Sequence, residues 1–153
     1  MANRLAKAVG SVFGIGFIPF APGTFGSLAA ALFYLFVPAL RPVELFVPLI
    51  LAVSVLGVWA GGVMEEEFGE DPSAAVIDEL AGQWVALVAL PASPLVVLCS
   101  FLFFRLYDIW KPGPVDKVQS LSGGWGIMTD DLLAGLLANL SVRIVMVALP
   151  FFS

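Results

Sequence analysis

The chain has 153 residues, of which 60% are apolar and only 12% charged, and its net charge is −5. Its mean hydropathy of +1.01 exceeds what the core of a soluble domain of this length requires, so we expect a single membrane domain over residues 1–153. The chain has no histidine, and Cys99 is its one cysteine. These counts exclude serine–histidine triads, imidazole-based zinc sites and an internal disulfide.

The first half of the chain predicts a short helix followed by a helical hairpin. Residues 1–20 favour an interfacial or packing helix, broken at "GIGF" and "PFAPG". The apolar runs 24–40 and 43–64 should pair and turn at Arg41 and Pro42, since proline disfavours helix continuation. Of the two, 43–64 reaches the roughly 20 residues that a hydrocarbon layer requires.

The run 80–104 is long enough to cross a membrane but contains Pro91 and Pro94. It can form one tilted span, or two half-length helices that turn back at "PASP". One span would leave Asp78 and Asp108 on opposite faces of the membrane. We therefore expect the re-entrant hairpin, whose turn must be shielded by protein because bare loop backbone is unsatisfied in lipid.

A second full-length span is predicted for residues 132–149. Arg143 lies about 18 Å along that helix, so it either snorkels to the interface or pairs within the bundle. Strand-like alternation is missing between the polar segments, which predicts an all-α fold, a compact multi-helix integral membrane bundle. Basic residues gather at one end, which the positive-inside rule makes cytoplasmic: Arg4, Lys7, Arg105, Lys111 and Lys117 against Arg41 at the other.

The segment "EDPSAAVIDELAGQW" places two acids directly before an apolar run. Asp71 is a favourable N-cap and Pro72 suits the first helical position, so we expect a helix that carries Asp78 and Glu79 two turns in. The acids could simply be solvated on a capped helix. However, carboxylates bordering an apolar run are costly, which favours a functional role.

A second acid pair, Asp130 and Asp131, lies in "GGWGIMTDDLLAG". Capping by Thr129 or Asp130 would explain one acid better than two. "DELAG" and "DDLLAG" both place Ala-Gly about one turn beyond an acid pair, and such small residues let helices approach closely. We expect the two pairs to meet around a common Mg²⁺, a cation that prefers oxygen ligands. The candidate metal ligands are Asp78, Glu79, Asp130 and Asp131.

The segment "FRLYDIWKPGPVDK" spaces Arg105, Asp108 and Lys111 three residues apart until Pro112 stops the helix. Arginine can bind phosphate through two donors and lysine through a mobile charge. The alternative is an interfacial collar of basic and aromatic side chains. We favour phosphate binding, because the neighbouring segments supply carboxylates for a cation.

The segment "APGTFGS" is a glycine-rich turn that leads into an apolar helix. Such a turn can present backbone N–H groups to an anion, although Thr24 or Ser27 could instead serve only as a helix cap. Together the four segments predict a carboxylate and phosphate site within apolar walls. That setting suits a lipid whose acyl chains stay in the bilayer.

The same four segments resemble the bacterial phosphatidylglycerophosphatase A family over roughly residues 10–145. The resemblance implies an all-helical fold and Mg²⁺-dependent removal of the terminal phosphate of phosphatidylglycerophosphate, giving phosphatidylglycerol at the bacterial inner membrane. It implies metal binding by the two acid pairs, catalysis by Asp78, Asp131, Arg105 and Lys111, and substrate binding by Thr24, Gly26, Arg105, Asp108 and Lys111. Gly113 and Ser122 depart from the family pattern, the first at a position that bears on substrate fit.

Two questions stay open at the level of sequence. Attack on phosphorus could come from water or from an aspartate that forms an aspartyl phosphate. A small transporter or ion pathway would also use buried carboxylates, but the glycines and basic residues beside them fit an anionic ligand better. The spaced-aspartate pattern of lipid phosphotransferases is missing.

Overall fold

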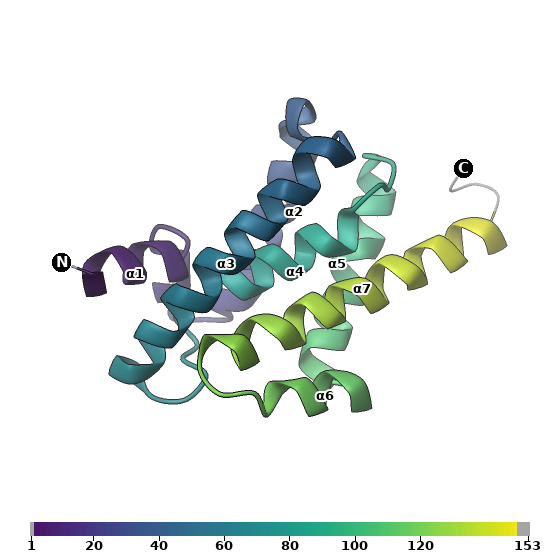
Figure 1. The fold of residues 1–153 in the computed structure, drawn as a ribbon. Coiled ribbons are helices and arrows are strands. Elements are labelled where there is room, and N and C mark those ends of the chain that lie inside the picture. The colour runs from purple at the N-terminus through teal and green to yellow at the C-terminus, as the bar shows by residue number, and fades with distance from the viewer. Residues whose placement is uncertain (1, 150–153) are drawn as a thin grey trace.

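A computed structural model describes residues 2–149 of the chain, which contain helices and no strand (Figure 1). The all-α prediction is confirmed. The helices are α1 (Ala2–Gly10), α2 (Pro22–Phe36), α3 (Val43–Phe68), α4 (Ile77–Leu87), α5 (Pro94–Trp110), α6 (Gly113–Gln119) and α7 (Gly124–Ala148), with 3₁₀ turns η1 (Ile15–Phe17) and η2 (Pro38–Leu40). Within this part of the chain, α3 and α7 are long and apolar enough to cross a membrane.

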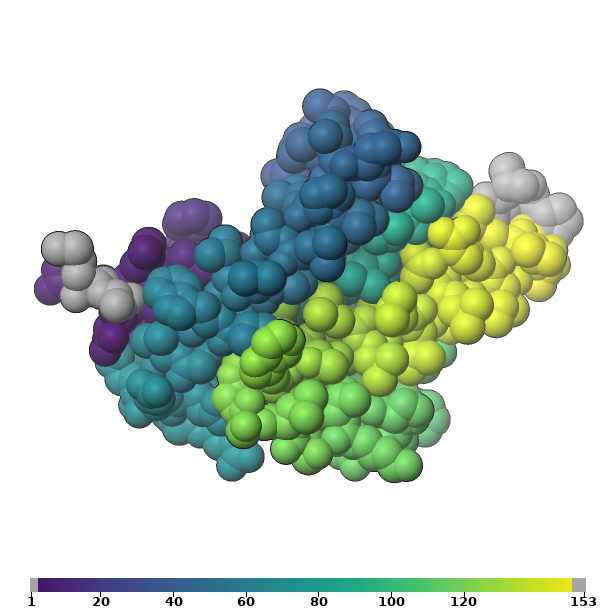
Figure 2. Space-filling view, viewed as in Figure 1, coloured from purple at the N-terminus to yellow at the C-terminus, as the bar shows by residue number. Residues whose placement is uncertain are grey.

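Helix α7 runs diagonally across the molecule and packs against α3, α4, α5 and α6 (Figure 1). With α3 it forms the face shown in Figure 2, where α1 extends at one side. Helices α2, α3 and α4 share an aromatic core of Tyr34, Phe46 and Trp84. The ring centroids of Tyr34 and Phe46 lie 5.3 Å apart, and those of Phe46 and Trp84 lie 5.7 Å apart. This core fixes α4 against α2 and so positions the acids at the start of α4.

Helices α4 and α5 are separate, with a connection at residues 88–93, so the single-span alternative is wrong. They turn back on each other, because Arg105 near the end of α5 lies 3.9 Å from Glu79 at the start of α4. How this hairpin sits in a membrane stays a prediction.

Side chains of the bundle bind backbone carbonyls in the turn between α4 and α5, although Ala89, Pro91 and Ser93 are exposed. The Tyr34 hydroxyl donates to the Leu90 carbonyl at 2.6 Å, and Asn139 Nδ2 donates to the Val88 carbonyl at 2.9 Å. Arg143 donates to the same Val88 carbonyl at 3.0 Å and to Asn139 Oδ1 at 2.8 Å. Arg143 therefore pairs within the bundle, and the carbonyls of Val88, Ala89 and Leu90 are satisfied by side chains. Shielding of the whole turn in a membrane stays a prediction.

The predicted start of α4 at Asp71 is wrong. Asp71 has φ 48°, in the left-handed region, and α4 begins at Ile77, with Asp78 and Glu79 in its first turn. The intervening segment docks on the end of α1 instead of continuing a helix, since the Val76 N–H donates to the Gly10 carbonyl at 2.8 Å. A tertiary hydrogen bond thus overrides the local capping signal.

The capping alternative for the second acid pair is wrong, because neither Thr129 nor Asp130 caps α7. The helix begins at Gly124 with Gly123 as its N-cap, which places Asp130 and Asp131 in the second turn. A Cβ on Gly124 would overlap the Val58 carbonyl of α3. The glycine-rich segment is therefore helical where it packs directly on the backbone of α3.

The crossing of α4 and α7 depends on the glycines of the two Ala-Gly pairs. A Cβ on Gly135 would overlap the Gly82 carbonyl, and a Cβ on Gly82 would lie 2.6 Å from the Asp131 carbonyl. Backbone therefore meets backbone at this crossing, as the small residues predicted. This contact brings the acid pair of α4 close to that of α7.

We predict that Gly135→Ala lowers the free energy of unfolding by about 1–3 kcal/mol, because the new methyl group must push α4 and α7 apart. Thermal unfolding in detergent measures the effect. Gly62→Ala is the matched control, since its Cβ would make ordinary contact at 3.6 Å with Gly124 N and should leave stability unchanged or slightly raised. Equal unfolding temperatures for the two variants would contradict this description of the crossing.

Candidate active site

Three helices bring their polar residues to one end of the bundle. Asp78 and Glu79 come from the first turn of α4, Asp130 and Asp131 from the second turn of α7, and Arg105 from the last turns of α5. The exposed fraction is 7% for Asp78, 3% for Asp130 and 2% for Asp131. Acids so deeply buried must have charged or hydrogen-bonding partners, because an isolated buried carboxylate is very costly.

Three of the carboxylates converge. One oxygen from each of Asp78, Glu79 and Asp131 lies within 4.8 Å of the others. Asp78 Oδ1, Glu79 Oε2 and Asp131 Oδ2 are buried and have no hydrogen-bond donor within the described protein. Three converging carboxylates, each with one oxygen that lacks a donor, match the ligand set of a hard cation such as Mg²⁺, so these residues could hold one.

Asp130 faces a different partner. Lys111 Nζ donates to Asp130 Oδ2 at 2.6 Å, and Asp130 Oδ1 accepts the Asp131 N–H at 3.0 Å. Lys111 occupies the C-cap of α5 with φ 46°, a position that directs its side chain across to α7. The two residues thus join α5 to α7 beside the carboxylate cluster, and metal binding by Asp130 stays a prediction.

The Arg105 guanidinium lies between the carboxylate cluster and α2. Its NH1 donates to Asp108, donates to Ser27 Oγ at 3.4 Å and lies 3.9 Å from Glu79 Oε1. Its Nε is buried and has no acceptor within the described protein. Arg105 is therefore held in place by Asp108 and Ser27, while its buried Nε is left without an acceptor.

The first turn of α2 closes the site through a residue that sequence reasoning did not single out. A Cβ on Gly23 would overlap Glu79 Oε1 and lie 3.3 Å from Arg105 NH1. The N-cap of α2 is Ala21, so neither Thr24 nor Ser27 caps the helix. Ser27 follows Gly23 by one turn and donates to its carbonyl at 2.9 Å, but no pattern in the sequence indicates the contact of Gly23 with Glu79.

The other predicted residues of this turn lie less directly at the site. Gly26 is buried where a Cβ would lie 3.0 Å from Val76 Cβ, so it allows α2 to pack on the segment before α4. Thr24 is half-buried in the first turn of α2, next to Gly23. Substrate binding by Thr24 and Gly26 stays a prediction.

Negative charge exceeds positive charge at this end of the bundle. Burial raises the pKa of Asp78 well above that of an ordinary aspartate, and the neighbouring Glu79 raises it further. Burial also raises the pKa of Glu79 to about 7. Burial lowers the pKa of Lys111, but the hydrogen bond and charge of Asp130, together with the charges of Asp71 and Asp131, outweigh this and leave the pKa raised. All three residues lie outside the two candidate spans, and their shifts are those of a site that lacks cationic charge.

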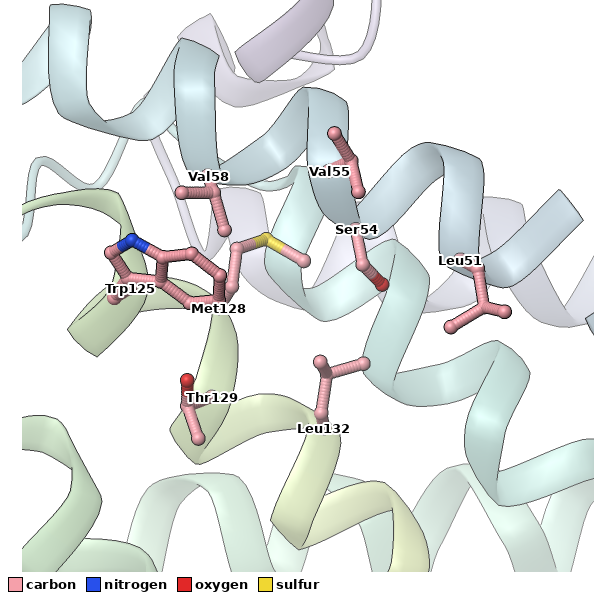
Figure 3. A pocket seen from close by; sticks show the side chains of 8 residues that line it. All are labelled: Leu51, Ser54, Val55, Val58, Trp125, Met128, Thr129 and Leu132. Carbon is pink, nitrogen blue, oxygen red and sulfur yellow. The ribbon is translucent and has the colours of Figure 1, made fainter. Parts of the chain in front are cut away.

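A pocket of about 290 Å³ lies away from this cluster, between α3 and α7. Figure 3 shows Trp125, Met128, Thr129 and Leu132 of α7 pointing toward α3. Its lining has no ionisable side chain. The pocket therefore offers no charged group for an ion.

Comparison with known proteins identifies the family of the chain. A family model described as Phosphatidylglycerophosphatase A matches residues 8–146. Phosphatidylglycerophosphatase A of Escherichia coli is 37% identical over 129 residues, covering 82% of this chain and 74% of its own, and that of Haemophilus influenzae is 36% identical over 133 residues, covering 85% and 82%. A Bacteroides thetaiotaomicron protein named putative phosphatidylinositol-3-phosphatase is 38% identical over 147 residues, covering 92% of each chain. No solved structure matches the chain.

The all-helical bundle, its two apolar spans and these relatives define a membrane-associated hydrolase of phosphoric monoesters. The match over nearly the whole chain shows that it belongs to the phosphatidylglycerophosphatase A family.

We predict that, with a chelator present, the protein loses stability as the pH rises from about 5 to 8. Glu79 has a folded-state pKa of about 7 against 4.5 as its ordinary value, so the folded chain retains a proton that the unfolded chain releases across this window. Deprotonation of Glu79 contributes at most about 3 kcal/mol to this loss of stability. Chemical unfolding in detergent at several pH values measures it.

The matched variant for this measurement is Glu79→Gln, which has no proton to lose and should show a flatter pH dependence. An identical slope for Glu79→Gln and the unaltered protein would contradict the raised pKa of Glu79.

Proposed function

We propose that this protein hydrolyses the terminal phosphate of phosphatidylglycerophosphate, giving phosphatidylglycerol and inorganic phosphate. The observation that carries the proposal is the convergence of Asp78, Glu79 and Asp131, with donor-free oxygens, beside the Arg105 guanidinium. Such a pairing of carboxylates and arginine suits a cation and the phosphate that the cation neutralises. Family membership supports the choice of substrate.

We propose Mg²⁺ as the cofactor, held by Asp78, Glu79 and Asp131. When bound, Mg²⁺ supplies the positive charge that neutralises a phosphoryl group during transfer. The fit rests on the three buried oxygens that no protein donor satisfies. Asp130 would lie beside these three metal ligands, since its carboxylate forms an ion pair with Lys111.

The basic residues have separate roles in this proposal. Arg105 donates to the phosphate through its free Nε, and Asp108 with Ser27 fixes the plane of its guanidinium. Lys111 holds Asp130 and adds positive charge where the phosphate would sit. A carboxylate near the phosphate can accept the proton of an attacking water, or can itself attack phosphorus.

The apolar surface of the bundle explains why the substrate would be a lipid. The spans α3 and α7 can anchor the chain in the bilayer, while the carboxylate cluster lies near the polar connections at one end of the bundle. Acyl chains could then remain in the membrane during hydrolysis. We propose the inner membrane as the location and the cytoplasmic side for the site, on the bias of basic residues toward this end.

A second candidate substrate is phosphatidylinositol 3-phosphate, favoured by the name of the Bacteroides thetaiotaomicron relative. Both lipids carry a phosphate monoester on the head group of a glycerophospholipid. They differ in size, because the inositol ring replaces a glycerol. Purified protein in detergent, given each lipid in turn, distinguishes the candidates by released phosphate.

We expect phosphate release from phosphatidylglycerophosphate with Mg²⁺ and none after chelation. Release from the inositol lipid alone would select the second candidate. No metal-dependent release from either lipid would refute both.

We predict that Asp131→Asn lowers turnover at least about 100-fold, because the amide cannot replace a carboxylate beside the metal and phosphate. The rate of phosphate release at saturating lipid measures the loss. Asp116→Asn on α6 is the control, since this exposed acid should tolerate the same change. Unchanged unfolding temperatures establish that both variants fold, and near-normal turnover of Asp131→Asn would remove Asp131 from the site.

A further inference from the structure

The connection between α1 and α2 carries three phenylalanines that the bundle does not cover. The exposed fraction is 90% for Phe13, 54% for Phe17 and 79% for Phe20. We call these three residues the aromatic lip. In water, rings exposed so closely along the chain would be an unfavourable apolar patch, which marks an interaction surface.

The backbone beneath the aromatic lip is held in one conformation. Val12 and Phe13 have φ values of 48° and 55°, which are unfavourable for side chains of their shape. Hydrogen bonds retain this conformation: the Phe13 N–H donates to the Ala8 carbonyl at 2.7 Å, and the Gly14 N–H donates to Ser11 Oγ at 3.0 Å. The rings are therefore presented outward by a built turn.

The opposite side of this turn is anchored to the body of the protein. Gly16 is buried, and a Cβ there would overlap the Ala74 carbonyl of the segment before α4. The turn η1 also contacts α2. The aromatic lip is thus fixed relative to the first turn of α4, which carries the acids.

An apolar stripe on α2 continues from the aromatic lip. Its members are spaced three or four residues apart and so lie on one face of the helix, opposite the buried face. They are 40 to 77% exposed: Phe25, Leu28, Leu32 and Phe36. Gly23, which contacts Glu79 and Arg105, lies in the same helix between the aromatic lip and this stripe.

We propose that the aromatic lip inserts among phospholipids at the membrane interface and that a phospholipid enters the site past it, with its acyl chain along the stripe of α2. Membrane lipid is the occupant because these exposed apolar side chains belong to a bundle that already contains two candidate spans. Arg105 contacts the buried face of α2 at Ser27, so the head group would pass around the first turn of that helix to reach it. The entry route rests on the proposed function, whereas insertion of the lip does not.

Insertion is tested by fluorescence quenching in reconstituted phosphatidylcholine vesicles. In a Cys99→Ser background, Phe17→Cys and the control Asp116→Cys are each labelled with a small fluorophore. Spin-labelled phosphatidylcholine should quench the label at position 17, and aqueous iodide should quench the label at position 116. Iodide quenching at position 17, or no quenching there by either agent because another protein covers it, would overturn insertion.

Entry is tested by activity on two substrates that share a head group. We predict that the double variant Phe13→Ser and Phe20→Ser raises the KM for long-chain phosphatidylglycerophosphate in vesicles at least about fivefold, because two interfacial rings are lost. Hydrolysis of a monomeric short-chain analogue should stay within about twofold, since it reaches the site from water.

The quenching and activity measurements distinguish failure of the proposed function from failure of the proposed entry route. An unaltered protein that hydrolyses neither substrate would refute the proposed function while leaving lip insertion to be judged by quenching. Equal effects of the double variant on both substrates, or no effect on either, would overturn entry past the aromatic lip.

Discussion

Burial of carboxylates at the crossing of α4 and α7 is the constraint on which the rest of the structure depends. Asp78, Glu79 and Asp131 would be most stable in water, yet the bundle places them within 4.8 Å of one another and leaves an oxygen of each without a donor. Such an arrangement is costly unless a cation neutralises it. The surrounding contacts of Arg105 and Lys111 supply only part of the missing positive charge.

Small residues make this arrangement geometrically accessible. Gly82 and Gly135 allow the backbones of α4 and α7 to touch, Gly124 brings α7 onto α3, and Gly23 leaves room for Glu79 at the start of α2. Each of these glycines lacks a side chain at a position where a carboxylate, or the helix that carries it, packs closely. The same contacts fix the arginine, because Ser27 of α2 bonds both Gly23 and Arg105.

Composition and apolar runs predicted the long helices, the two candidate spans and the separation of α4 from α5, because hydropathy and proline act locally, but they did not predict α6. The predicted start of α4 and the capping alternative for α7 were wrong, since both starts depend on distant contacts: Val76 with Gly10 in one case, and Gly124 with Val58 in the other. The acids and bases of the site were identifiable from their apolar surroundings. Gly23 was not, because its role is the space it leaves for a residue 56 positions away.

The most direct test of the account is to count bound cations with Mn²⁺ as a paramagnetic probe for Mg²⁺. Electron paramagnetic resonance of the purified protein should show tightly bound Mn²⁺ that Mg²⁺ displaces. Both Asp78→Asn on α4 and Asp131→Asn on α7 should lose this signal, because the two helices share the ion. Retention of full Mn²⁺ binding in both variants would contradict the shared carboxylate site.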